Sequence, residues 1–223
     1  QPLNAQVAER LRTMIVNGEM EVGKKIPFTE IAEKLGVSLT PLREAIKVLA
    51  EEQLVELTPN RGARVLPVSV EETVALFEVI AELESLGAKL AAERMTEDEL
   101  ADLEAMHAEM RDYYETGNRE AYFEMNSRIH AAIVTYSHNP VLLHTHQKMT
   151  VRVARVRFIA VHQNQRWEQA MQEHEDVMQA FRDRDGNRAA GIWRNHLMES
   201  GRVTVEILQA KEQEEQASGA VAG

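Results

Sequence analysis

Residues 37–45 constrain the fold of this chain more than any other stretch. A short predicted helix precedes them, and Gly36 ends it, because glycine readily adopts the left-handed conformation of a helix C-cap. Ser38 or Thr40 can cap a second helix, and Pro41 lies in its first turn, where a missing N–H costs nothing. The pattern therefore predicts two helices joined by a short turn.

The second of these helices has one apolar and one polar face. Apolar residues recur at helical spacing on one side, whereas Arg43, Glu44 and Lys47 lie on the other. Two short β-like runs follow, and the tight turn between them holds Arg61 beside Gly62. Such a helix and hairpin are typical of a winged helix that reads the DNA major groove with the helix and meets the minor groove or a phosphate with the wing. The alternative is a small helix–hairpin core without a ligand.

The excess of acidic over basic side chains lies entirely in the C-terminal part of the chain. The net charge is −11, yet residues 1–67 hold nine basic and nine acidic side chains, and residues 68–223 hold sixteen basic and twenty-seven acidic ones. The N-terminal part is therefore not repelled by phosphate, but it lacks a strong nonspecific attraction to DNA. We infer that two copies dock together, which predicts a homodimer on a palindromic operator of double-stranded DNA.

Composition narrows the class of protein further. The 223 residues suffice for two small domains with separate cores. The chain has no cysteine, so neither disulfides nor cysteine metal sites are possible. No apolar run approaches the ~20 residues that span a bilayer, and no signal peptide is visible. We therefore expect a cytoplasmic protein with no membrane partner.

The C-terminal part is predicted to be helical almost throughout. Apolar residues recur at three- and four-residue steps, and the breaks fall at short polar stretches. The predicted fold is mainly α: a winged helix-turn-helix of three helices and a β-hairpin (1–67) joins an antiparallel all-α bundle (68–212), and a flexible tail follows (213–223). The six helices of the predicted bundle cover residues 70–94, 97–115, 119–137, 140–162, 166–184 and 187–211.

Four polar residues of the helical part form a candidate metal site. Asn126 and His130 are four apart and share one helix face, and His174 and His196 lie on the last two predicted helices. Three imidazoles and one oxygen donor suit Zn²⁺ or Ni²⁺. From spacing alone, the alternative is that these are surface histidines or satisfied core histidines. The other histidines have no partner evident from the sequence: His107, His138, His144, His146 and His162.

The N-terminal motifs resemble the DNA-binding domain of the GntR family of bacterial transcription regulators. The matching motifs are Gly36 to Ser38, Thr40 to Ala45, Leu54-Val55 and Arg61-Gly62. The resemblance implies DNA contacts by these residues: Ser38, Thr40, Arg43, Arg61 and Gly62. Lys47 extends the same polar helix face. Family members usually have arginine where this chain has Leu39, and often one near Thr29, so a weaker affinity or a different operator is expected.

The C-terminal motifs resemble the FCD effector domain of FadR-type members of that family. The matching motifs are Leu83-Glu84, Leu90 to Arg94, His130, Asn139 to Leu142, His174 and His196-Leu197. Six rather than seven predicted helices indicate the branch with the smaller, VanR-like form of the domain. Many such domains bind a divalent metal through one aspartate and three histidines, which implies His130, His174 and His196 as ligands and Asn126 at the aspartate position. An amide oxygen still ligates, but it brings no charge, so the metal affinity is expected to fall.

The resemblance also raises the question of what binds the effector. Members often have an arginine that meets a carboxylate effector where this chain has Ile80. Arg152 and Arg155 are three apart, share a helix face, and are predicted to take that role, whereas Arg157 is predicted to turn away. The alternative is that these arginines form a solvated basic face.

The predicted function is that of a ligand-responsive transcription regulator, either a repressor or an activator. A small organic acid or sugar acid would bind beside the metal, and its differential affinity for two domain arrangements would shift DNA binding. One alternative is a metal-dependent enzyme fused to a DNA-binding domain, with Glu173 or Glu175 as its general base. Another is a constitutive architectural DNA-binding protein, which would leave the histidines unexplained.

Overall fold

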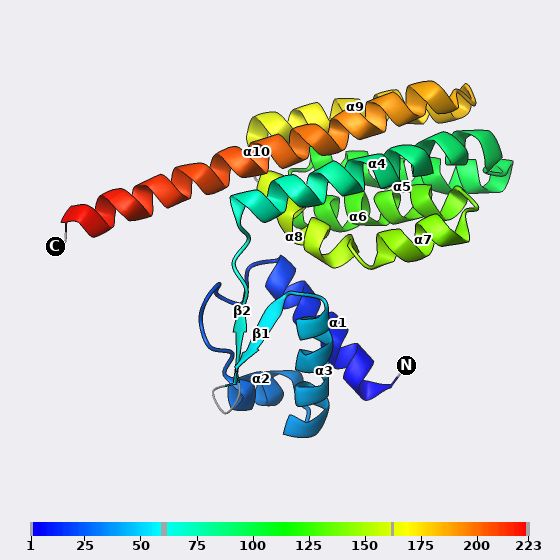
Figure 1. Ribbon diagram of the computed structural model, residues 1–223. Helices are drawn as coiled ribbons and strands as arrows, with labels where there is room; N and C mark the ends of the chain where they lie inside the picture. Colours follow the sequence, from blue (N-terminus) through cyan, green and yellow to red (C-terminus); the bar gives the residue numbers. More distant parts are fainter. Residues whose placement is uncertain (1, 59–61, 162, 222–223) are drawn as a thin grey trace. The chain divides into compact units, whose positions relative to one another are not determined.

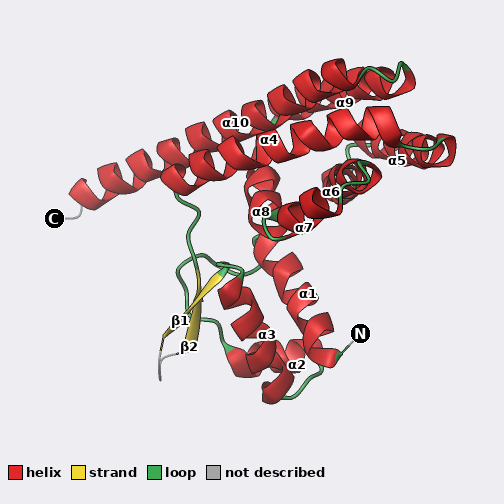
Figure 2. Cartoon of the chain, turned by 45° about the vertical axis from the view of Figure 1, so that its right-hand side comes forward, coloured by secondary structure: helices red, strands yellow, loops and turns green. Residues whose placement is uncertain are grey.

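The computed structural model describes residues 2–58, 62–161 and 163–221, and it confirms the mainly α fold. The chain separates into two compact units, residues 1–68 and 69–223 (Figures 1 and 2). The first unit holds three helices and a β-hairpin, and the described residues of the second form helices joined by short turns. Among the described residues, no helix is both long enough and apolar enough to cross a membrane.

A helix-turn-helix lies at the centre of the first unit. The elements of this unit are α1 (Leu3–Val16), α2 (Phe28–Leu35), α3 (Leu39–Glu51), β1 (Val55–Thr58) and β2 (Gly62–Val65). Gly36 has the left-handed conformation at the C-cap of α2, as the sequence predicts, and Ser38 is the N-cap residue of α3. The apolar face of α3 is wholly buried through Leu42, Ala45, Ile46 and Leu49. Burial of this face leaves the polar face of α3 at the surface.

The hairpin of the first unit has the antiparallel pairing that the sequence predicts. Val55 lies opposite Val65, and Thr58 lies opposite Gly62 at the end next to the turn. Gly62 has a φ of 95°, which side chains other than glycine rarely adopt. Arg61 lies outside the described residues, so its DNA contact stays a prediction.

The second unit is built on two long antiparallel helices. The elements of this unit are α4 (Val70–Arg94), α5 (Glu97–Glu115), α6 (Arg119–Tyr136), α7 (Pro140–Gln147), α8 (Thr150–Val161), α9 (Asn164–Arg182) and α10 (Gly186–Val221). Helices α4 and α10 run side by side in opposite directions (Figures 1 and 2). They pack tightly at Gly201, where an added Cβ would lie 2.6 Å from Cγ of Phe77. The core between the helices includes Phe77, Phe181 and Trp193, all fully buried or nearly so.

The helix count of the second unit corrects the sequence-based prediction. Residues 140–162 were expected to form one helix, but a turn at residues 148–149 divides them into α7 and α8, so the described part of this unit has seven helices rather than six. The turn is stabilised by the Met149 amide and the Thr150 hydroxyl, which both donate to the carbonyl of His146. Helix α10 also continues to Val221, past residue 211, where the sequence predicted its end.

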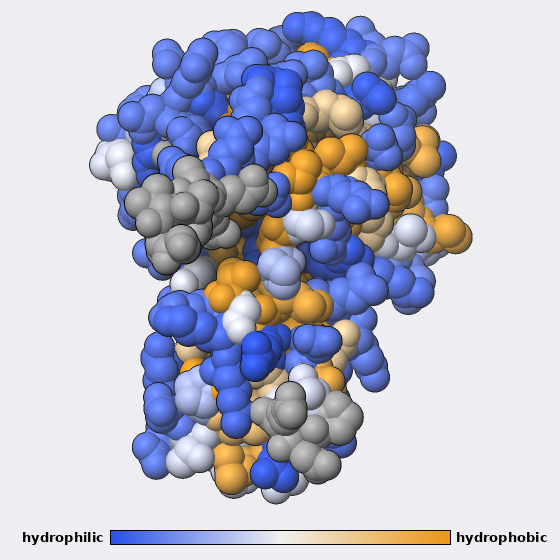
Figure 3. All heavy atoms as spheres, turned by 60° about the vertical axis from the view of Figure 1, so that its left-hand side comes forward, coloured by the Kyte–Doolittle hydropathy of each residue, from blue (hydrophilic) through white to orange (hydrophobic). Residues whose placement is uncertain are grey.

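The surface drawn in Figure 3 is mostly hydrophilic, with apolar patches between the charged side chains. Several large apolar side chains of α4 remain exposed, among them Val79 (49 % exposed) and Leu86 (44 % exposed). These two residues are seven positions apart and therefore lie on the same face of the helix.

Candidate functional site

The predicted DNA-contacting residues of α3 are at the surface. Ser38, Thr40, Arg43 and Lys47 are all exposed, and Lys47 forms an ion pair with Glu44 on the same helix (2.9 Å). The side chain of Ser38 makes no capping hydrogen bond to α3, although the residue occupies the N-cap position. The polar face of α3 is therefore accessible.

A groove of about 850 Å³ joins this helix face to the hairpin. Arg43 and Lys47 of α3, Thr29 of α2 and Gly62 of β2 all line it. Lys25 lines the same groove, and its Cε would lie 3.2 Å from a Cβ added at Gly62. No local motif marks Lys25 in the sequence, because its place beside the hairpin depends on a long-range pairing with Arg64 of β2.

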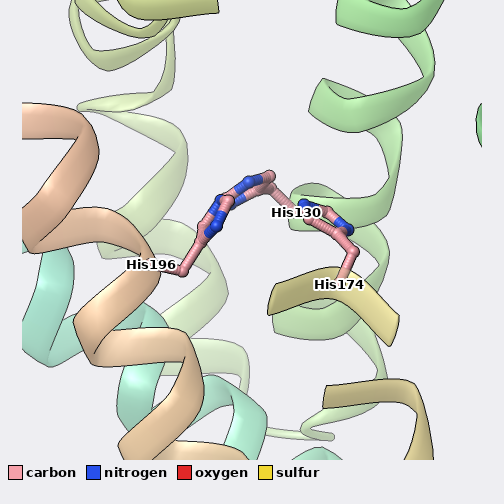
Figure 4. Close-up of side chains that lie close together, drawn as sticks. All are labelled: His130, His174 and His196. Carbon is pink, nitrogen blue, oxygen red and sulfur yellow. The ribbon is translucent and has the colours of Figure 1, made fainter. Parts of the chain in front are cut away.

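Three histidines from three helices meet in the core of the second unit. His130 of α6, His174 of α9 and His196 of α10 are all buried, and one nitrogen of each lies within 4.8 Å of the others (Figure 4). Asn126 lies one turn before His130 on α6, is 7 % exposed, and has an Oδ1 atom without a hydrogen-bond partner. The three histidines predicted to bind a metal thus come together from distant parts of the chain. The fourth predicted ligand, Asn126, lies one helical turn from His130.

Two carboxylates contact this cluster, the fully buried Glu84 and the partly buried Glu173. Nδ1 of His130 donates to Glu84, whereas Nδ1 of His196 lies 2.7 Å from a carboxylate oxygen of Glu173 and 3.1 Å from Nη2 of Arg166, which can only donate. Nε2 of His130 therefore keeps its lone pair, and it has no partner among the described residues. A carboxylate that orients a histidine in this way is the usual outer shell of a metal site.

Burial keeps the histidines neutral. It lowers the pKa of His130 to about 4 and the pKa of His174 and of His196 well below the ordinary value. A metal ion needs neutral imidazoles, and His174 offers two ring nitrogens without partners. Bonds of about 2.0–2.1 Å need the nitrogens to close to about 3.4 Å from one another, which small side-chain rotations can supply. The residues present therefore fit a divalent metal such as zinc or nickel.

Glu84 links the histidine cluster by hydrogen bonds to two other buried side chains of the helical unit. This fully buried carboxylate of α4 accepts hydrogen bonds from His130, from Nε2 of His146 (2.9 Å) and from Nε1 of Trp193 (3.1 Å). Burial alone would raise the pKa of Glu84, but its contacts with His130, with His146 and with Arg157 hold that pKa well below the usual value. The roles of Glu84 and His146 could not be predicted from local spacing, because their contacts join residues far apart in the chain.

A small cavity lies beside the histidine cluster, and its arginines differ from the predicted ones. Its volume is about 20 Å³, and its lining includes Asn126, His196, Arg157 and Arg166. Arg152, by contrast, forms an ion pair with Glu72 of α4. Residues two positions apart point to opposite sides of a helix, so the face of α8 that holds Arg157 excludes Arg155. Arg157 and Arg166 therefore line this cavity and Arg152 and Arg155 are not in its lining, while the effector role of Arg152 and Arg155 stays a prediction.

Comparison with known proteins assigns both units. Residues 3–65 match the family described as bacterial regulatory proteins, gntR family, and residues 75–199 match the FCD domain. The chain belongs to the GntR family of bacterial regulators, in the group with an FCD domain. This finding confirms the resemblance that the sequence motifs indicated.

Individual GntR relatives are similar over nearly the whole chain. The HTH-type transcriptional repressor RspR of Escherichia coli K12 is 26 % identical over 209 residues, which are 94 % of this chain and 92 % of RspR. The galactonate operon transcriptional repressor of the same organism is 28 % identical over 204 residues, covering 80 % of this chain and 86 % of that protein. The solved structure of E. coli McbR/YncC has a TM-score of 0.79 at 22 % identity and covers 95 % of this chain and 99 % of McbR.

Proposed function

We propose that this GntR-family regulator binds an operator through its first unit and is switched by a small organic acid or sugar acid that binds beside a metal in its second unit. The observation that supports this most directly is the buried histidine cluster with an adjoining cavity whose lining includes two arginines, on the same chain as an exposed recognition helix. The switch requires only that the effector binds one arrangement of the protein more tightly than another.

The DNA contacts are proposed to come from α3 and the hairpin. Ser38, Thr40 and Arg43 would lie at the start of the recognition helix, and Lys47 would follow one turn later. Gly62 lets the backbone of the wing come close to DNA, and Lys25 adds a cation to the same groove. Arg61 is proposed from the sequence alone.

A homodimer on a palindromic operator is proposed for two reasons. Residues 1–67 have no net charge, so one copy has little nonspecific attraction to phosphate, and two copies double the specific contacts. The exposed Val79 and Leu86 on one face of α4 are apolar area that a second copy would cover.

The metal is proposed to be held by His130, His174 and His196, with Asn126 as the oxygen donor. When bound, a divalent ion supplies a Lewis-acidic centre that attracts a carboxylate oxygen. Asn126 leaves the ligand set without a negative charge, so the affinity for metal is expected to be lower than with an aspartate there. Repression is the proposed mode of action, since RspR and the galactonate regulator are both named repressors.

An enzymatic role has less support. The two carboxylates proposed as a general base are both engaged: Glu173 contacts Arg166 (2.8 Å) and His196, and Glu175 accepts from Arg111 (2.7 Å). The names of the relatives also point to regulators rather than enzymes.

The test measures operator affinity of the full chain, with an operator selected from random duplexes, before and after addition of a panel of organic and sugar acids. At least one acid should shift the affinity, and the shift should be lost in His174→Ala but kept in His138→Ala, a matched variant of an exposed histidine. An unchanged affinity across the whole panel would refute the switch while leaving DNA binding itself intact.

A further inference from the structure

Leu39 is a large apolar side chain among the exposed, mostly polar residues of α3. It is the first residue of the helix and is 39 % exposed, whereas the next two leucines, Leu42 and Leu49, are wholly buried. Its neighbours Ser38 and Thr40 are exposed as well. A single exposed leucine needs no special explanation, so the position of Leu39 relative to the groove beside α3 decides what it can contact.

Leu39 lies on the face of α3 that lines the groove toward the hairpin. It precedes Arg43 by four residues and Ile46 by seven, and residues at these spacings share one side of a helix. Arg43 and Ile46 both line the groove, together with Lys47. Leu39 therefore extends this face by one turn toward the start of α3. In a helix-turn-helix, the first residues of the second helix contact the edges of the bases in the major groove.

The chemistry of the side chain restricts which base it can face. Leucine has no side-chain donor or acceptor, and most groups that the bases present in the major groove are donors or acceptors. Such groups would lose water against Leu39 without gaining a hydrogen bond, which costs free energy. Thymine differs, because it also presents a C5 methyl group in the major groove. Thymine is therefore the base whose edge fits Leu39.

The charge of the first unit increases the importance of such a contact. Residues 1–67 carry no net charge, and Lys47 is paired with Glu44 on the same helix (2.9 Å). Attraction to phosphates therefore contributes little to binding, and contacts with bases must supply a larger share of the free energy. An apolar contact with a methyl group supplies part of that share without requiring a charge.

We propose that Leu39 contacts the C5 methyl group of a thymine in the operator half-site and thereby selects a T·A pair at that position. The proposal rests on the DNA binding proposed above and names one base that the operator must contain. An arginine at the same place would select guanine instead, because arginine donates two hydrogen bonds to the edge of that base.

The first experiment compares thymine with uracil in the operator, because deoxyuridine lacks only the C5 methyl group. The full chain is titrated by fluorescence anisotropy against an operator selected from random duplexes, in which each thymine is replaced in turn. Replacement of one thymine of the half-site should weaken binding about fourfold, the loss expected for one buried methyl group. If no replacement changes the affinity, the proposal is overturned.

Variants of the protein identify the residue that contacts the methyl group. Leu39→Ala should bind the thymine and uracil operators equally well, because the contact is then missing from both complexes. Its binding stays measurable, since Arg43 and Lys47 remain. Leu3→Ala removes another exposed leucine, on α1, and should keep the fourfold difference. Thr40→Ser removes a neighbouring methyl group, retains the hydroxyl, and should keep the difference too. A difference that persists in Leu39→Ala, or disappears in Thr40→Ser, would refute the assignment.

A gain of specificity provides a second test. Leu39→Arg, put through the same selection from random duplexes, should prefer guanine over thymine at this position by about tenfold or more. Continued selection of thymine by this variant would contradict the contact. Melting temperatures check the fold of each variant, which a change at an exposed residue should leave intact.

Two results separate this proposal from the function on which it rests. If the full chain selects no duplex, the proposed DNA binding itself fails. If it selects an operator whose affinity depends on no thymine methyl group, DNA binding stands and the contact by Leu39 is refuted. All affinities are measured without an effector, so failure of the proposed switch would not alter either result.

Discussion

Replacement of Glu84 should be the most damaging single change in the helical unit. The carboxylate of Glu84 is fully buried and accepts hydrogen bonds from His130, His146 and Trp193, while Arg157 lies nearby as a counter-charge. Glu84→Ala leaves three buried donors without an acceptor, at about 1–3 kcal/mol each. The loss is therefore at least about 3 kcal/mol, a large part of the roughly 5–15 kcal/mol that stabilises a typical domain.

Glu84→Gln should be milder, because the side chain keeps its size and one acceptor oxygen. If that oxygen faces His130 and Trp193, the new amide faces Nε2 of His146. His146 can then accept with Nε2 and donate from Nδ1 to the hydroxyl of Thr150, 3.3 Å away. The remaining cost is the exchange of charged for neutral hydrogen bonds, about 1 kcal/mol each, together with the loss of the counter-charge to Arg157. Weaker orientation of His130 should also lower metal affinity about 10–100-fold.

Urea unfolding followed by tryptophan fluorescence measures these costs in the helical unit alone, because Trp167 and Trp193 are the two tryptophans of the chain. Glu82→Ala is the matched control: Glu82 lies on the same helix, and its exposed ion pair with Arg194 is worth less than about 1 kcal/mol. If Glu84→Ala destabilises the unit no more than Glu82→Ala does, the hydrogen bonds that Glu84 accepts do not stabilise the helical unit as argued.

Three other changes test the remaining assignments. Arg43→Ala should weaken operator binding more than tenfold in a fluorescence anisotropy titration without altering the circular dichroism spectrum, and equal binding would refute the placement of the recognition helix. His174→Ala should reduce both the metal content by mass spectrometry and the melting temperature, since a ligand of the folded state stabilises it; a full metal complement in this variant would remove His174 from the site. Gly201→Ala should destabilise the helical unit by about 1–3 kcal/mol, because the new methyl group would overlap Phe77, whereas Gly191→Ala on the same helix meets open space and should be neutral or stabilising in urea unfolding.

Local sequence signals predicted the helix-turn-helix of the first unit well, because single residues determine where its helices end and which face is buried. Gly36 is needed for the left-handed cap, and the apolar spacing of α3 places its buried face. The break between α7 and α8 was missed because no glycine or proline marks it. That break depends on hydrogen bonds of Met149 and Thr150 to the His146 carbonyl, and neither residue type signals a turn by itself.

The candidate site could be predicted only in part, since periodicity gives the spacing of side chains but not the face that a neighbouring helix covers. The spacing of Asn126 and His130 placed them on one face, whereas His174 and His196 became convincing only through the family resemblance. On α8, spacing separated Arg155 from Arg157 correctly but did not tell which of them faces the cavity. A signal for Glu84 was present: it lies on the buried face of α4 with Ile80 and Ala88, where an unpaired carboxylate would be costly.

Glu84 also implies that the metal and the acid do not bind independently. It orients His130 in the histidine cluster and lies 3.9 Å from Nη1 of Arg157, which lines the adjoining cavity. A divalent ion adds two positive charges beside the two cavity arginines, so a carboxylate should bind more tightly to the metal-loaded protein. By linkage, a small dicarboxylate such as malonate should raise metal affinity by the same factor that metal raises malonate affinity. Calorimetry with malonate, with and without metal, measures this factor, and a value of one would mean that the histidines and the arginines form two separate sites.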